Sequence, residues 1–118
     1  MKKIFIIFML LFTYLVSFGY QCAGSLEEDV EVYSLICDRI TLFAERAKLA
    51  QSLGYKADAI EEYKLAIQEA IISEQIINHM LTTHKSQLSY DGQESLKRQL
   101  EFSQKTREIY QSLINIMR

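Results

Sequence analysis

Two histidines, His79 and His84, lie close together in one helical pattern. Residues five apart are separated by about 140° around an α-helix, so this spacing does not place two imidazoles on one metal ion as an i, i+4 pair does. Neither histidine has an acidic residue three or four positions away. We therefore expect a surface position for His79, a position for His84 at the edge of the packed stripe or at the helix C-terminus, and no metal or other cofactor.

Glu74 is the other polar residue in an unusual place, because it interrupts an apolar stripe. We expect it to lie at a helix edge or to pair with a basic residue of the following helix. The chain has no glycine-rich phosphate loop, no haem-attachment motif and no nucleophile elbow. The sequence thus predicts a protein without enzymatic activity.

The two cysteines, Cys22 and Cys37, are an obvious candidate disulfide in an exported protein. The capping box Ser25-Leu26-Glu27-Glu28 predicts a helix from residue 26, which puts Cys37 about 18 Å along its axis. The tail back to Cys22 spans only about 10 Å, whereas bridged Cα atoms lie within about 7 Å. We therefore predict no bridge within one chain and a buried free thiol at Cys37.

Residues 1–19 have the features of an export signal. Met1-Lys2-Lys3 is cationic, residues 4–16 are almost entirely apolar, and Ser17 and Gly19 suit cleavage before Tyr20. We expect an exported protein, periplasmic or secreted, with a short tail at 20–25 and one domain at 26–118. Two alternatives stay open: an uncleaved N-terminal membrane anchor, or a lipidated Cys22.

The rest of the chain is predicted to be helical. The full sequence has no proline and four glycines, and its hydrophobic fraction of 49% is that of a globular protein. Gly54 and Gly92 separate the helical patterns, and Ser25, Asp58 and Asp91 each precede a glutamate by three positions, as N-caps do. We predict helices at 26–53, 58–87 and 92–117.

Apolar residues recur at steps of three and four in each helix, which is typical of helix–helix packing. The predicted packing positions are Leu26, Val30, Tyr33, Cys37, Ile40, Ala44 and Ala47; then Ile60, Tyr63, Ile67, Ala70, Ile77, Leu81 and Leu88; then Leu96, Leu100, Ser103, Tyr110, Ile114 and Met117, broadened by Phe102, Ile109 and Leu113. Long helices with short turns favour an all-α, antiparallel three-helix bundle with up-down-up topology.

One segment resembles a known family. Residues 54–67, with Ala59, Tyr63 and Ala66 at the family's small-aromatic-small spacing, resemble the second half of a tetratricopeptide repeat, and Phe43 and Ala47 partly suit its first helix. The resemblance lacks the terminal proline and does not recur along the chain, whereas such solenoids need about three repeats. We interpret it as a tight helical hairpin; a single tetratricopeptide-like binder is the third functional reading.

The candidate functional residues are apolar side chains on helix faces that point away from the predicted packing positions. They form two columns, Leu35, Leu42 and Leu49 in the first helix, and Leu65, Ile72 and Ile76 in the second. Aligned exposed apolar residues mark interfaces. With a net charge of −2, nucleic acid is a disfavoured partner. The sequence therefore predicts a non-enzymatic envelope or periplasmic adaptor, inhibitor or immunity-type protein that binds a protein partner or itself; a membrane-tethered structural protein is the alternative.

Overall fold

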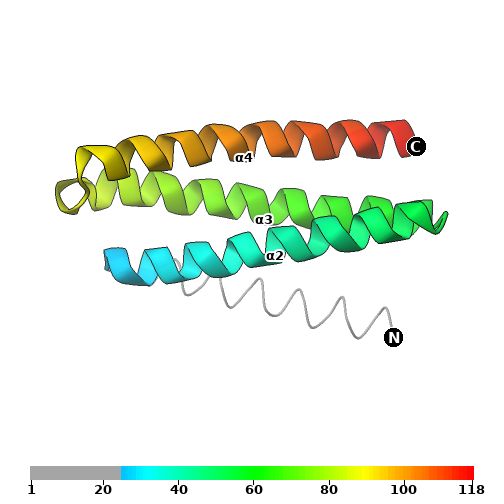
Figure 1. Cartoon of the computed structure of the whole chain (residues 1–118), viewed down its shortest axis with the longest axis horizontal. Helices are drawn as coiled ribbons and strands as arrows, with labels where there is room; N and C mark the ends of the chain where they lie inside the picture. Colours follow the sequence, from blue (N-terminus) through cyan, green and yellow to red (C-terminus); the bar gives the residue numbers. More distant parts are fainter. Residues whose placement is uncertain (1–24) are drawn as a thin grey trace.

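The structure, a computed structural model, describes residues 25–118, which form three α-helices and one short 3-10 helix. The α-helices are α2 (Leu26–Ser52), α3 (Lys56–Thr83) and α4 (Tyr90–Met117), and the 3-10 helix η1 (Lys85–Gln87) follows α3. They run up, down and up (Figure 1), which confirms the predicted all-α bundle. The predictions for the export signal, its cleavage and Cys22 fall outside the described residues.

The helix starts follow the capping chemistry, with two corrections. Ser25 Oγ accepts a hydrogen bond from the Glu28 N–H at 3.1 Å, as predicted for the first cap. α4 begins earlier than expected, because Ser89 rather than Asp91 is its cap and accepts from the Gly92 N–H at 3.0 Å. α3 likewise begins earlier than expected, at Lys56, so Asp58 lies inside its first turn. A carboxylate in this position interacts favourably with the helix dipole.

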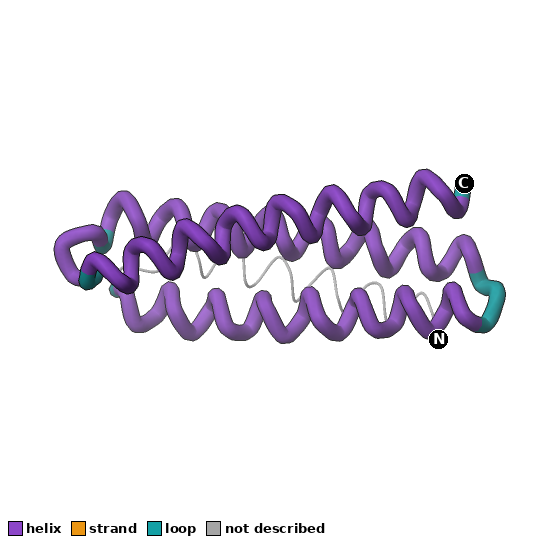
Figure 2. The backbone as a smooth tube through the Cα atoms, turned by 45° about the horizontal axis from the view of Figure 1, so that its top comes forward, coloured by secondary structure: helices purple, strands orange, loops and turns teal. Residues whose placement is uncertain are grey.

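The connection between α2 and α3 is tight because of Gly54. Its φ is +83°, the left-handed region in which a residue without a Cβ ends a helix at low cost. The turn reverses the chain within a few residues, as Figure 2 shows at the loop between the two helices. As a result, the start of α2 lies beside the end of α3.

α3 is the central helix, and α2 and α4 pack on either side of it (Figure 1). The molecule measures 49 × 28 × 16 Å, so the three helices form a flattened layer rather than a closed triangle. α2 and α4 approach each other little along the backbone, and their contact is mainly through side chains such as Tyr110, which packs against the cluster of Phe43 and Ala66. Each outer helix therefore has a long edge that no other helix of residues 25–118 covers.

The buried face of α2 differs from the prediction by about one residue. Ile36 and Phe43 are fully buried, whereas Val30 is 48% exposed and Cys37 is half-buried. Burying Ile36 and Phe43 removes more apolar surface from water than burying Cys37 and Val30 would, which accounts for this rotation. None of the helices formed by residues 25–118 is long and apolar enough to cross a membrane.

Candidate functional sites

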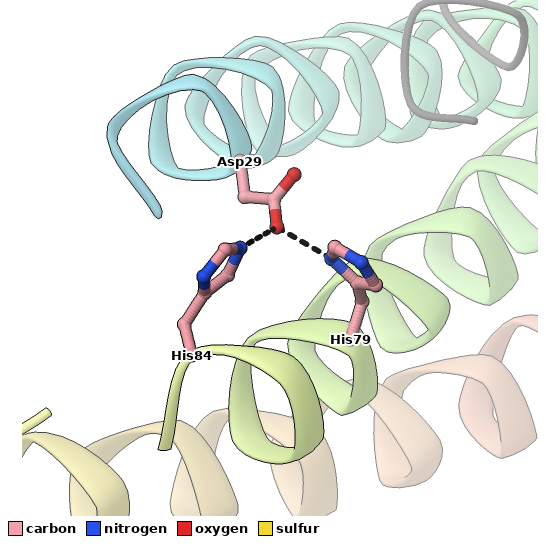
Figure 3. Close-up of side chains that lie close together, drawn as sticks. All are labelled: Asp29, His79 and His84. Carbon is pink, nitrogen blue, oxygen red and sulfur yellow. Dashed lines mark hydrogen bonds and ion pairs between the residues drawn. The ribbon is translucent and has the colours of Figure 1, made fainter. Parts of the chain in front are cut away.

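The two histidines lie together at one end of the bundle, around the carboxylate of Asp29. The His79 Nδ1 atom is 2.6 Å from Asp29 Oδ2, and the His84 Nε2 atom is 3.2 Å from the same oxygen (Figure 3). Asp29 is fully buried, His84 is 3% exposed, and the side chain of His79 is 27% exposed. Three groups that bind metals or protons thus converge at the edge of the core.

This convergence overturns the expectation that the histidines point in different directions. His84 is the C-cap of α3, and its φ of −110° and ψ of 19° are not helical, so the helical rotation of 100° per residue does not reach it. The two rings pack edge to face with centroids 5.3 Å apart. Asp29 comes from the first turn of α2, which the Gly54 turn brings beside the end of α3.

Two further charged pairs join the helices inside the molecule. Arg39 of α2 and Glu69 of α3 are almost completely buried, with Nη2 3.0 Å from Oε1, and burial lowers the pKa of the Arg39 guanidinium. Glu74 of α3 is bound by Arg107 of α4, with Nη2 2.8 Å from Oε1. The second pair agrees with the expectation that Glu74 finds a basic partner in the following helix.

The predicted apolar columns have different outcomes. In α2, Leu35, Leu42 and Leu49 are exposed by 41%, 45% and 61%, as expected of an outer face. In α3 the prediction of an outer face is wrong, because Ile76 is fully buried in the core. Leu65 and Ile72 are half-buried and pack against core clusters. The reason is the central place of α3, which has a helix on each side and so buries a wider arc of its surface.

α4 carries an exposed apolar column that the sequence did not single out as an interface. Phe102, Ile109 and Ile116 are exposed by 72%, 58% and 79%. The first two were expected to broaden the packed stripe, but α4 contacts α3 only along a narrow face, where Ile114 and Met117 are its buried residues. The heptad spacing of Phe102, Ile109 and Ile116 is the sequence signal that could have revealed this column.

A shallow hollow opens on this outer face of α4. Its lining residues are Lys105, Glu108, Ile109, Ser112 and Leu113. The hollow combines apolar walls with charged rims, a composition suited to an inserted apolar side chain with polar neighbours.

Comparisons of the chain with protein-family models, with curated proteins and with solved structures find no match.

Proposed function

We propose that this chain is an exported, non-enzymatic protein that assembles with copies of itself, the outer edge of α2 in one copy binding the outer edge of α4 in the next. The observation that carries the proposal is the matched pattern of these two edges. Both are exposed, and both place apolar residues at heptad spacing. Long exposed apolar columns on a small protein are typical of interaction surfaces.

The charges beside the two columns are complementary. The leucine column of α2 is flanked by the exposed acidic residues Glu31, Asp38 and Glu45, and the column of α4 by the exposed Arg98, Lys105 and Ser112. In each helix the flanking residue lies four positions before an apolar one. In heptad terms, the apolar residues of both edges occupy a positions and the flanking polar residues occupy d positions. The d residues are acidic on α2 and mainly basic on α4.

A parallel alignment satisfies both columns at once. Leu35, Leu42 and Leu49 then face Phe102, Ile109 and Ile116, while Glu31 faces Arg98 and Asp38 faces Lys105. An antiparallel alignment would place a positions against d positions and set leucines against charged residues. Pairing α2 with α2 would bring acidic residues together, so the α2–α4 combination is favoured over a two-fold dimer.

The contact is heterologous, because the two edges are different surfaces of one molecule, and it can therefore join more than two copies. A heterologous contact that does not close by rotation continues from copy to copy. The average mass should accordingly increase with protein concentration beyond that of a dimer. Light scattering after size exclusion over a wide concentration range measures this, and a monomeric mass at every concentration would contradict the proposal.

Charge reversal tests the interface most directly. Asp38→Lys and Lys105→Asp should each weaken association, and the double variant should restore it, because the pair is then reversed rather than broken. Leu42→Glu should also weaken association while leaving the protein helical, since a charge buried in the interface would lack a partner. Leu53→Glu is the control: Leu53 is 60% exposed but lies at the end of α2, outside the interface.

The alignment itself is tested by cross-linking. Leu42→Cys in one copy and Ile109→Cys in another should form an intermolecular disulfide in a background in which Cys22 and Cys37 are serine. The combination of Leu35→Cys with Ser112→Cys, which only an antiparallel contact brings together, should not. Efficient cross-linking of the second combination would exclude the parallel arrangement.

A further inference from the structure

We infer that Asp29, His79 and His84 form a binding site for one divalent transition-metal ion, with Zn²⁺ as the representative ion. Two imidazoles and one carboxylate are a ligand set that suits zinc and its neighbours rather than calcium or magnesium, which prefer oxygen ligands alone. This inference is independent of the self-assembly proposed above, because the site lies at the end of the bundle and shares no residue with the α2–α4 contact.

The distances are close to those of a tetrahedral site. One oxygen of Asp29 and one nitrogen of each histidine all lie within 4.8 Å of one another. Ligands about 2.0–2.1 Å from a zinc ion are roughly 3.3 Å apart in a tetrahedron. The present separations from Asp29 Oδ2, 2.6 Å for His79 Nδ1 and 3.2 Å for His84 Nε2, are respectively below and close to this distance.

A second observation also indicates a bound cation at this site. Asp29 Oδ1 is buried and has no hydrogen-bond partner among the described residues. The His84 Nε2 atom is also buried and, although 3.2 Å from Asp29, it lacks the alignment of a hydrogen bond. Buried polar atoms are rarely left in this state, and a cation held by His84 Nε2 and by both carboxylate oxygens of Asp29 would satisfy them together.

The site has an entrance on the side of His79. That side chain is 27% exposed, whereas the other two are buried. An ion can enter there, and a water molecule can complete the coordination, as in zinc sites with three protein ligands. Since Asp29 belongs to α2 and the histidines to the end of α3, a bound ion would hold these two helices together.

Isothermal titration of the purified protein with Zn²⁺, and its melting temperature with and without Zn²⁺, test the inference. We expect one ion per chain and, at a free concentration a hundredfold above Kd, a rise in melting temperature of about 10 °C or more. Mg²⁺ at the same concentration should have no effect. An unchanged melting temperature with no heat of binding would overturn the inference.

Variants assign the binding to these residues. His79→Gln should fold, because His79 is partly exposed, and should weaken Zn²⁺ binding at least about tenfold. Asp29→Asn should weaken Zn²⁺ binding to a similar extent. Glu27→Gln, an exposed acidic residue in the same turn of α2, is the matched control and should bind normally. Cys37→Ser should also bind normally. Binding that persists in His79→Gln and Asp29→Asn, or that disappears in Cys37→Ser, would place the ion elsewhere and refute the site.

Discussion

Arg107 binds Glu74 with two hydrogen bonds, from Nε to Oε2 and from Nη2 to Oε1 at 2.8 Å, so that one guanidinium joins α4 to α3 side by side. Ser103 also donates to Glu74 Oε2, at 2.9 Å. The Glu74 side chain is 10% exposed and that of Arg107 is 33% exposed. These bonds raise the pKa of Arg107 and satisfy a carboxylate that would otherwise be buried without a counter-ion.

Removing this guanidinium should loosen α4. We expect Arg107→Ala to lower the free energy of unfolding by about 2 kcal/mol, between the values for exposed and fully buried pairs, because Glu74 stays behind in the core. Urea denaturation measures the loss. Lys97→Ala is the control on the same helix, since its pair with Glu94 is exposed and should contribute almost nothing. Equal losses in the free energy of unfolding would show that the Arg107–Glu74 pair contributes no more to stability than an exposed pair.

Cys37 should behave as a small packing residue. It is a free thiol, half-buried, and burial raises its pKa. We expect Cys37→Ala to lower the free energy of unfolding by about 1 kcal/mol, with the same value in reducing and oxidising buffer. A loss of several kcal/mol that occurs only under oxidising conditions would instead indicate a disulfide. Because a raised pKa leaves little thiolate, alkylation of Cys37 in the native protein should also be slow.

The stability should fall in alkaline solution. Burial raises the pKa values of Tyr63 and Tyr110, whose rings pack 5.4 Å apart. A group whose pKa is higher in the folded than in the unfolded state favours folding below the unfolded pKa. That contribution is lost as the pH rises through the folded pKa, here above about 10. Melting temperatures from pH 8 to 11 should therefore decline, and Tyr110→Phe should make the decline shallower. An identical decline in the variant would assign the effect to other groups.

Processing is tested on the protein as cells export it. We expect the mature chain to begin between Tyr20 and Ser25, which intact-mass measurement of the exported form resolves. Retention of residues 1–18 would favour the membrane anchor, and the added mass of lipid on Cys22 would favour the lipoprotein.

The sequence predicts the fold well because helix periodicity, capping residues and a turn glycine all act locally. Ser25 and Gly54 act as predicted, and the expected partner of Glu74 lies in the following helix. Ile76 was misplaced because periodicity alone does not tell which helix is central and so buried on more than one side.

The histidine site depends on contacts between helices, and helical periodicity along one helix does not give these. Asp29 lies one heptad before the fully buried Ile36 and therefore on the same face of α2. Antiparallel pairing after a short turn also implies that the start of α2 meets the end of α3. Those two facts together would have placed Asp29 beside His79 and His84. A rotation of 100° per residue was applied up to His84, one residue beyond the end of α3, and it made the two histidines appear to point in different directions.

The central position of α3 also determines how the chain folds. Each extensive helix–helix contact joins neighbours in the chain, α2 with α3 and α3 with α4, so loop closure is short and the topology favours rapid folding. The α2–α3 hairpin has most of the buried residues and can form first. α4, with Ile114 and Met117 as its buried residues, then docks last and opens first, and its amide protons should exchange with solvent ahead of those of α3.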